Sequence, residues 1–349
     1  MPTRSAPPAT RTPFAFVQAI LLAYRQRGLA PDAALRRAQI APSPQGQWPA
    51  RVSALQFERL CHAAMQELDD EAPGWFSRPL PWGSYGLLAR ASATAPTLGV
   101  ALARWCRHHG LLTRDVTLHL HTEGGSARVA IHEHRDMGAL REFALLSLLR
   151  NVHGLACWWV DSHIALRAAH FPFAAPPHAA VYGALFPGPL RFGAPQAALH
   201  FDAGYLALPL RRDGPALDAM LRRALPLMVL PYRRDRLLAK RVRQLLHERA
   251  SHTAATLAAE LGMSTRTLHR QLAAEGAQLQ TLKDQARRAR ACELLLRTHQ
   301  PLKHIAQATG FGNDKSFIRA FRAWTGQTPE QYRHQGGQAL ASIKKAIRA

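Results

Sequence analysis

The sequence predicts an α+β N-terminal domain followed by an all-α C-terminal domain with two helix-turn-helix units joined by a long helix. Three observations lead to this prediction: a hairpin pattern of alternating apolar residues at 116–132, continuous helical periodicity from residue 236, and an internal repeat within that helical region. A chain of 349 residues is long enough for two domains that each bury a core.

Four segments are expected along the chain. Residues 1–12 are rich in Pro, Thr, Ser and Arg, which is typical of disorder, and residues 13–231 should form the α+β domain. The all-α domain should occupy residues 236–335, after a junction at residues 231–235. For the tail, residues 336–349, we favour disorder, with a frayed basic helix as the alternative.

Helical and strand patterns alternate in the N-terminal domain. Apolar residues at helical spacing predict helices near residues 16–28, 52–68, 96–109, 139–158 and 215–229. Short β-like pieces between prolines are expected at 164–168, 190–192 and 197–201. Polar residues interrupt the apolar stretch from Phe143 to Val160, which we therefore interpret as a buried helix and not as a membrane span.

The hairpin pattern turns at Gly124-Gly125, so that paired residues have numbers that sum to 249. One face then carries the apolar core residues Leu118, Leu120, Val129 and Ile131. The other face carries four histidines, His119, His121, His132 and His134. We interpret this second face as a solvated polar surface. A metal site is the alternative, disfavoured because Arg128 lies opposite His121.

The chain is strongly basic. It has 45 Lys and Arg against 23 Asp and Glu, a formal net charge of +22. Residues 232–349 hold 22 of the basic and 8 of the acidic residues, so the excess is concentrated in the C-terminal third. This balance favours a polyanionic partner such as nucleic acid, whereas a generally Arg-rich composition is the alternative explanation.

Several functional classes lack their signatures. The cysteines are far apart and form no Cys-x-x-Cys pair, which disfavours a zinc ribbon and fits a reducing cytosol. No apolar run follows the first basic residue, so no signal peptide is expected. No P-loop, Gly-x-Ser-x-Gly or His-Glu-x-x-His motif occurs, and we expect no catalytic site, metal or cofactor.

The repeat carries the functional prediction. Its first copy is Leu257-Ala258-x-x-x-Gly262-Met263, followed by Leu268-x-Arg270-x-Leu272. Its second copy is Ile305-Ala306-x-x-x-Gly310-Phe311, followed by Phe317-x-Arg319-x-Phe321. The offset is 48 residues at the first glycine and 49 at the Arg-centred core, which is too regular for chance.

Each copy has the features of a helix-turn-helix unit: a small residue where the helices cross, a turn glycine, and two apolar residues one turn apart on the second helix. These structural positions are Ala258, Gly262, Leu268, Leu272, Ala306, Gly310, Phe317 and Phe321. Ser264 and Asn313 are expected to cap the second helices, near residues 264–274 and 313–324, which would lie in the major groove.

The two copies are separated by a helical pattern without Gly or Pro, residues 279–298. Such a helix is about 30 Å long, close to one turn of B-DNA at about 34 Å. A single helical hairpin would be weak support for DNA binding, because such hairpins are common in protein cores. Two copies, this spacer and the basic charge together favour a protein that reads two successive major grooves.

The segment from Ile305 to Arg333, with its closing Gly326-x-Thr328-Pro329-x-x-Tyr332-Arg333, resembles the signature of AraC/XylS-type transcriptional regulators. The resemblance covers residues 236–335. It implies that bases are read by Arg266, His269, Arg270, Asp314, Lys315 and Arg319. It implies DNA-backbone contacts by Ser264, Thr265, Asn313, Ser316 and Arg322, and a structural role for Pro329. Gly312 and Lys315 depart from the family pattern, which leaves the target sequence open.

The N-terminal domain resembles, more weakly, the arabinose-binding-type domain of ornithine-utilisation regulators, through Phe186–Ala194, Leu199-x-Phe201 and Tyr205-Leu206-x-x-Pro209-Leu210. This resemblance implies a small-molecule sensor that dimerises, and leaves the effector and its residues unknown. Core packing is favoured over a ligand pocket for the aromatic residues Trp82, Tyr85, Trp105, Trp158, Trp159 and Tyr182. An effector carboxylate could be bound by Arg90, Arg104 or Arg141.

We therefore expect a ligand-responsive, sequence-specific transcription activator. It should act as a homodimer on double-stranded DNA, contact RNA polymerase, and work at the nucleoid in the bacterial cytoplasm, away from any membrane. Basic residues of the spacer, namely Lys283, Arg287, Arg288 and Arg290, would contact phosphates or pack along it. The alternatives are an architectural protein that binds DNA by charge alone, and an enzyme with a nucleic-acid docking domain.

Overall fold

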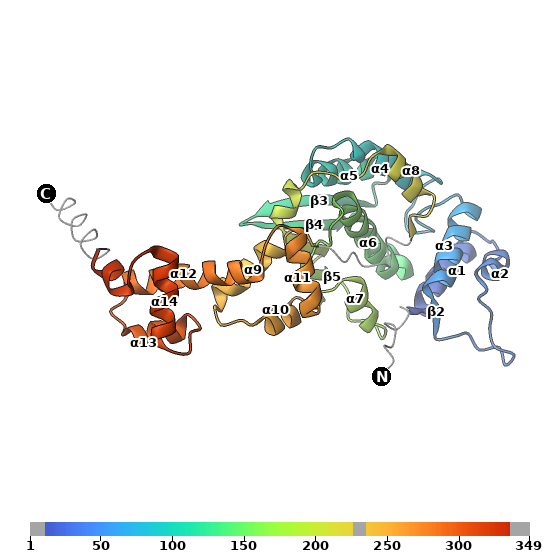
Figure 1. Ribbon diagram of the computed structural model, residues 1–349. Helices are drawn as coiled ribbons and strands as arrows, with labels where there is room; N and C mark the ends of the chain where they lie inside the picture. Colours follow the sequence, from blue (N-terminus) through green and yellow to red (C-terminus); the bar gives the residue numbers. More distant parts are fainter. Residues whose placement is uncertain (1–10, 226–234, 336–349) are drawn as a thin grey trace. The chain divides into compact units, whose positions relative to one another are not determined.

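A computed structural model of the protein describes residues 11–225 and 235–335. The chain divides into two compact units, Met1–Asp235 and Arg236–Ala349 (Figure 1). Disorder was expected for residues 1–12, of which residues 1–10 lie outside the described residues. Residues 11 and 12 belong to a strand, contrary to this expectation. The tail, residues 336–349, lies outside the described residues altogether.

The first unit combines helices with a five-stranded sheet. Its helices are α1 (Phe14–Gln26), α2 (Asp32–Ala38), α3 (Ala54–Glu67), α4 (Ser84–Ala93), α5 (Leu98–Leu112), α6 (Arg141–Val160), α7 (Ala180–Leu185) and α8 (Gly214–Leu221), with 3-10 turns η1 (Gly138–Leu140) and η2 (Ala203–Ala207). Its strands are β1 (Arg11–Pro13), β2 (Arg51–Ser53), β3 (Val116–Glu123), β4 (Ser126–Glu133), β5 (Leu166–Phe171), β6 (Leu190–Phe192) and β7 (Ala197–Asp202). The α+β prediction is confirmed.

The sheet runs in the order β3-β4-β7-β5-β6, with antiparallel neighbours except for the parallel pair β5–β6. The hairpin has the expected register, with His119 opposite Ala130 and His121 opposite Arg128. β5 begins two residues later than the sequence pattern indicated and runs on to Phe171, because it pairs with both β6 and β7. The sheet is therefore built around the predicted hairpin.

Helix α6 forms the centre of the first unit's core. By length and composition, Gly138–Val160 could cross a membrane, but 94% of its most apolar window is buried inside the protein. It packs against α5 and against β7. Burial on all sides explains why its apolar residues show no single helical face, which matches the prediction of a core helix.

Short elements of the first unit are absent from the sequence-based expectation: the two-stranded ribbon β1–β2 and the helices α2, α4 and α7. The ribbon leads into α3 through a capping box, in which Ser53 and Gln56 bond each other's backbone N–H groups. The helix expected at 215–229 is α8 up to Leu221, and residues 226–229 lie outside the described part. Elements this short give too few periodic positions to be recognised.

The second unit is helical throughout its described length. Its helices are α9 (Leu238–Glu248), α10 (Ala254–Glu260), α11 (Thr265–Ala274), α12 (Leu279–Arg297), α13 (Leu302–Ala308) and α14 (Asp314–Thr325). One apolar core joins α9, α10, α11 and the start of α12. A second core joins the end of α12 with α13 and α14. The long helix therefore contributes to both cores, as the two-unit prediction requires.

Candidate nucleic-acid interface and cavity

The first helix-turn-helix unit consists of α10 and α11. Ala258 is buried where the helices cross, and the amide of Met263 donates a 2.9 Å hydrogen bond to its carbonyl. Gly262 has a φ of +64°, a conformation that favours glycine at the end of a helix. Ser264 caps α11 by accepting from the amide of Thr267 at 3.2 Å. Local sequence thus determines the turn and the start of α11.

The second helix-turn-helix unit, α13 and α14, repeats this construction. The amide of Phe311 donates to the carbonyl of Ala306 at 2.8 Å, and Gly310 has a φ of +78°. Asn313 caps α14 by accepting from the amide of Ser316 at 2.8 Å. Pro329, near the end of this unit, is buried. The apolar positions named for both units are fully buried: Leu268, Leu272, Phe317 and Phe321.

The outward faces of α11 and α14 carry the residues expected to read bases. All six side chains are exposed, namely those of Arg266, His269, Arg270, Asp314, Lys315 and Arg319. Asp314 differs from the others, because its Oδ1 accepts from the amide of Lys315 at 2.9 Å. Its carboxylate therefore also stabilises the first turn of α14, where negative charge is favoured.

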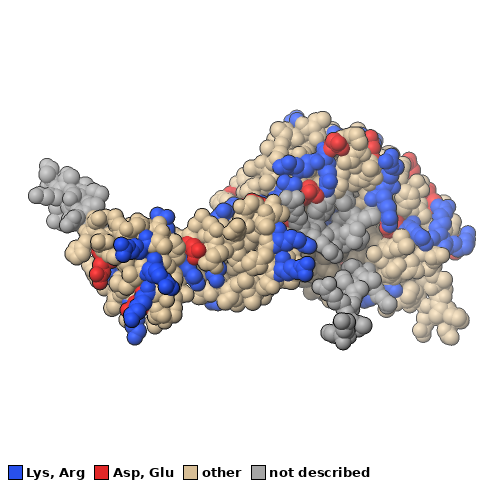
Figure 2. Space-filling model, viewed as in Figure 1, with Lys and Arg blue, Asp and Glu red and all other residues tan. Residues whose placement is uncertain are grey.

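The residues expected to contact the DNA backbone lie at the starts of the same two helices, apart from Arg322. Thr265 and Arg322 are exposed, and Ser316 is half-buried. Ser264 and Asn313 use their side-chain oxygens as helix caps, so their positions mark helix N-termini, which attract phosphate groups. Figure 2 shows Lys and Arg side chains spread over the visible surface of the helical unit, with fewer Asp and Glu among them.

The α12 spacer has 19 residues and is therefore about 28 Å long. Of its basic residues, Arg287 turns inward onto the second helix-turn-helix unit: the Nη2 of Arg287 donates to the carbonyl of Gly310 at 3.4 Å. Arg290 pairs with Glu293 at 2.8 Å. Burial beside Arg287 lowers the pKa of Lys283. Arg288 is exposed.

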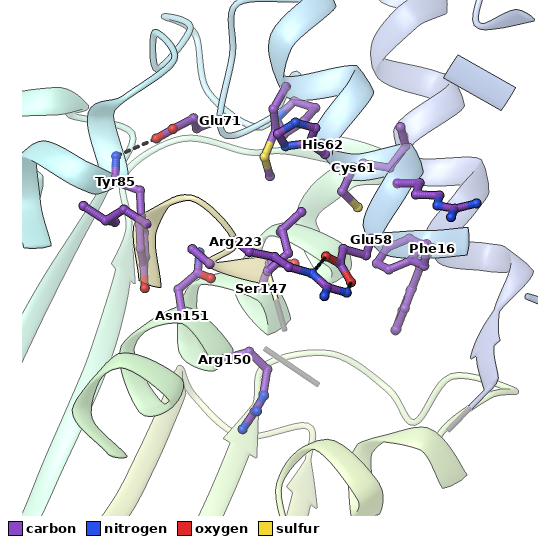
Figure 3. Close-up of a pocket in the computed structure, with 18 of the residues that line it drawn as sticks. Phe16, Glu58, Cys61, His62, Glu71, Tyr85, Ser147, Arg150, Asn151 and Arg223 are labelled. Carbon is purple, nitrogen blue, oxygen red and sulfur yellow. Dashed lines mark hydrogen bonds and ion pairs between the residues drawn. The ribbon is translucent and has the colours of Figure 1, made fainter. Parts of the chain in front are cut away.

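The N-terminal compact unit, Met1–Asp235, contains a cavity of about 860 Å³. Figure 3 shows Ser147, Arg150 and Asn151 on α6 at one side of it, and Glu58 on α3 at the other. Aromatic side chains form much of its wall: Phe16, Phe57, Trp75, Trp82, Tyr85 and Phe143. This volume and lining are typical of a small-molecule site.

The acidic groups of the cavity have partners. Glu58 receives two hydrogen bonds from Arg223, at 2.5 and 2.9 Å. Glu71 accepts from the amides of Gly83 and Tyr85 at 2.8 and 2.5 Å. Burial nevertheless raises the pKa of the Glu71 carboxyl.

Arg150 is the most deeply buried cation of the wall. Its Nη1 lies 3.0 Å from Nδ1 of His153, and its guanidinium carbon lies 5.7 Å from the centroid of the Phe186 ring. Burial lowers the pKa of Arg150 to about 10 and, with the neighbouring Arg150 charge, that of His153 to about 3. At neutral pH Arg150 is therefore charged, and His153 is a neutral acceptor.

The sequence-based candidates for an effector pocket divide. Trp82 and Tyr85 line the cavity, whereas the other four aromatic candidates, Trp105, Trp158, Trp159 and Tyr182, are core residues outside its lining. Arg90 lines it but pairs with Asp218 at 3.0 Å. Arg104 donates to Thr94, and Arg141 binds both carboxylate oxygens of Glu133 away from the cavity.

Sequence reasoning missed Trp75, Ser147 and Arg150 as cavity residues. The available signal was the set of polar residues that interrupt the apolar helix α6, because burying a polar side chain costs free energy unless it has a hydrogen-bond partner. On the hairpin, the His119 and His132 rings lie 5.0 Å apart. Within residues 11–225 and 235–335, no group of three or more His, Cys, Asp or Glu has metal-binding geometry.

Comparison with known proteins matches both units. Residues 28–210 match the family described as the arabinose-binding domain of AraC transcription regulators, N-terminal, and residues 257–335 match a helix-turn-helix domain. The ornithine utilization regulator of Pseudomonas aeruginosa is 29% identical over 93% of this chain and 97% of its own. The transcriptional regulator VirS of Mycobacterium tuberculosis is 28% identical over 90% and 93%.

The chain was also compared with proteins of known structure. The transcriptional regulator CdpR from Pseudomonas aeruginosa is 19% identical over 92% of this chain and 98% of its own, with a TM-score of 0.32. The DNA-binding domain of AdpA, solved with a target DNA, is 26% identical over 28% of this chain and 87% of its own, with a TM-score of 0.25.

Proposed function

The protein belongs to the AraC family of DNA-binding transcription regulators, and on that premise we propose that it reads two successive major grooves of one duplex in response to a small molecule. It is a regulator and not an enzyme. The observation that carries the proposal is the pair of matching helix-turn-helix units, each with an exposed basic face on its second helix.

In this proposal α11 reads one half-site through Arg266, His269 and Arg270. A guanidinium at such a position binds guanine through two parallel hydrogen bonds in the major groove. The second half-site is read by α14 through Asp314, Lys315 and Arg319, where Asp314 would accept from a cytosine amino group. The different chemistry of the two faces predicts two unlike half-sites.

Phosphate contacts would hold each helix in register. Ser264 and Thr265 stand at the N-terminus of α11, and Asn313 and Ser316 at that of α14. The partial positive charge of a helix N-terminus favours a phosphate at both places. Arg322, one turn after Arg319, would reach the backbone that flanks the second half-site.

We assign the cavity of the first unit to the effector. It is enclosed largely by apolar and aromatic side chains with a few buried polar groups, which is the usual composition of a ligand site. Residues 13–231 then form the effector-binding and dimerisation domain, and residues 236–335 the DNA-binding domain. Homodimerisation, activation through RNA polymerase and a place at the nucleoid in the bacterial cytoplasm complete the proposal.

The test is fluorescence anisotropy of the full-length protein with DNA from upstream of its own and neighbouring genes, in scrambled competitor at two salt concentrations. A complex that survives the competitor and has a steep salt dependence supports sequence-specific reading. Equal, salt-sensitive binding to every fragment would support the architectural alternative instead. The same assay, repeated with candidate effectors, tests whether the first unit controls binding.

A further inference from the structure

The lining of the cavity restricts the chemistry of the molecule that it can hold. This inference rests on the proposal that the cavity is the effector site. The wall is mainly apolar, and its rings contact one another: the centroids of Phe143 and Trp75 are 5.7 Å apart, and those of Phe143 and Phe16 are 5.4 Å apart. A molecule that is polar over its whole surface, such as a sugar, would lose most of its hydrogen bonds with water here.

Arg150 is the buried cation among the described lining residues, and it is already engaged. Its Nη1 lies 3.0 Å from Nδ1 of His153, its guanidinium carbon lies 5.7 Å from the centroid of the Phe186 ring, and the side chain has further interactions. Figure 3 shows it directed away from Ser147 and Asn151. A ligand anion would therefore find no buried cation available to it, and a ligand cation would share the wall with a buried positive charge.

The other charged groups of the described lining have partners or are exposed to solvent. Glu58 receives two hydrogen bonds from Arg223, Asp218 pairs with Arg90, and Glu71 accepts from two backbone amides. The remaining basic side chains of the lining are exposed, namely those of Arg59, His62 and Arg222. Exposed charges add little to binding, because water already solvates them. The interior of the cavity therefore favours an uncharged molecule.

Two buried polar atoms of the lining residues are without a hydrogen-bond partner within the described part of the chain, and both are uncharged. They are Oγ of Ser147, whose residue is 1% exposed, and Nε1 of Trp75, whose residue is 3% exposed. An indole N–H is only a donor, so Trp75 requires an acceptor. Buried polar groups in native proteins are normally hydrogen-bonded, so each of these atoms indicates a place for a ligand group.

Tyr85 and Asn151 add two more uncharged groups to the lining. Figure 3 shows both side chains at the cavity, and within residues 11–225 and 235–335 neither side chain has a hydrogen bond to another residue. Asn151 follows Ser147 by one turn of α6, so these two side chains share one face of the helix. A phenol hydroxyl and a side-chain amide can both donate a hydrogen bond.

These four side chains can donate hydrogen bonds to a ligand oxygen and offer no opposite charge to an ion. We propose that the effector is an uncharged, largely apolar molecule with a carbonyl oxygen, such as a ketone, an ester or an amide. Its hydrocarbon or aromatic body lies against the rings. Its carbonyl oxygen, which has two lone pairs, accepts hydrogen bonds from members of this polar set, namely Trp75, Tyr85, Ser147 and Asn151.

The family description names arabinose and one relative is named for ornithine use. The cavity of this chain fits neither chemistry. Arabinose is uncharged but offers hydroxyl groups on every side, and ornithine carries two ammonium groups. The inference therefore separates this chain's effector from the molecules in those names.

The experiment is a titration of the full-length protein, read by tryptophan fluorescence and thermal denaturation at neutral pH. The probes are 4-phenylbutanamide and octanamide, each with its carboxylate and its amine, and L-arabinose and L-ornithine. Butylbenzene serves as a probe without a carbonyl group. Each amide should bind at least about tenfold more tightly than its carboxylate and its amine, because the cavity leaves a buried ion without a counter-charge. Arabinose, ornithine and butylbenzene should also bind more weakly than the amides.

Two variants test the polar set. Ser147→Ala and Tyr85→Phe should each weaken binding of 4-phenylbutanamide by about three- to tenfold, the usual worth of one hydrogen bond. Both should change the affinity for butylbenzene little, because it makes no hydrogen bond, whereas a general loss of packing would weaken both probes. The matched control is Ser92→Ala, since Ser92 is also buried with its Oγ unpartnered in the described structure but lies on α4 outside the cavity lining.

Four results would each overturn the inference: a carboxylate or an amine that binds as tightly as its amide, butylbenzene that does so, equal losses in the Ser147 and Ser92 variants, or no binding of either amide. If a charged probe binds and changes DNA affinity, the effector cavity stands and only the assignment of an uncharged ligand fails. If an amide binds as expected and DNA affinity does not respond, the chemistry of the cavity stands and its role as the effector site fails.

Discussion

The guanidinium carbon of Arg287 lies 5.0 Å from the centroid of the Phe311 ring, and the same side chain donates to the carbonyl of Gly310. Arg287 belongs to the middle of α12, whereas Gly310 and Phe311 form the turn of the second helix-turn-helix unit. A cation over an aromatic face is attracted to it. Arg287 therefore fastens the turn of the second unit to the helix that connects both units.

We predict that Arg287→Ala reduces the preference for one spacing between half-sites. Without this contact the second helix-turn-helix unit gains freedom relative to α12, so affinity for DNA at the native spacing should fall about tenfold. Changing the spacing by one or two base pairs should then reduce affinity less than it does in the wild type. Arg287→Lys should recover little, because an ammonium lacks the planar face that stacks on a ring. The measurement is anisotropy with duplexes of graded spacing.

Arg290→Ala is the charge-matched control for Arg287→Ala. Arg290 is on the same helix but pairs with Glu293 at the surface. If both variants lower affinity equally at every spacing and reduce the salt dependence by the same amount, Arg287 only contacts phosphate and the positioning role is wrong.

A second prediction concerns base reading. Arg270→Ala and Arg319→Ala should each cost about 1–3 kcal/mol of binding free energy and relax the choice of base at one position of the site. Arg322→Ala, from the proposed backbone contacts, should instead weaken specific and random DNA alike and lower the salt slope by about one. Selection from a randomised duplex pool reads out both effects. A uniform loss in the Arg270 variant would move that residue to the backbone class.

A third prediction tests the rigid spacer. Insertion of two alanines within 285–290 turns the second helix-turn-helix unit by about 200° relative to the first one and moves it about 3 Å further along the axis of α12. The two reading helices can then no longer face the same side of one duplex, so binding to the tandem site should fall to the level of a single half-site. Retained high affinity would show that the units act independently of α12.

The helical unit was largely predictable from sequence because its signals are local. Gly262 and Gly310, the caps Ser264 and Asn313, and the buried pairs of α11 and α14 lie within a few residues of one another and occur twice. The hairpin register was predictable for the same reason, since the turn fixes which residues face each other.

The cavity was not predictable in this way. Phe16, Glu58, Ser147 and Arg223 come from segments far apart in the chain, and their meeting depends on how α1, α3, α6 and the residues after α8 pack. Arg90 and Arg141 were reasonable carboxylate-binding candidates by residue type. Each is occupied by an acidic partner that only the fold brings near, Asp218 and Glu133.

The last prediction follows from His109 on α5, which is 3% exposed, with the rings of Phe76 and His109 6.2 Å apart and Nδ1 unpartnered in the described structure. Burial lowers the pKa of His109 from 6.5 to about 4. The unfolded chain therefore binds a proton below pH 6.5 that the folded chain does not bind until about pH 4. This residue destabilises the fold as the pH falls through that window, by about 1.4 kcal/mol per pH unit.

His109→Leu should remove that part of the slope while changing the unfolding free energy near pH 7 little, since a neutral, buried imidazole is replaced by an apolar side chain of similar size. Urea unfolding between pH 7 and 4.5, followed by tryptophan fluorescence, gives the difference curve against the wild type. His121→Leu, on the exposed face of the hairpin, serves as the control. Parallel curves for the wild type and the His109 variant would mean that the His109 imidazole takes up its proton at the same pH in the folded and the unfolded protein. The acid-sensitive slope would then arise from other groups, such as His153.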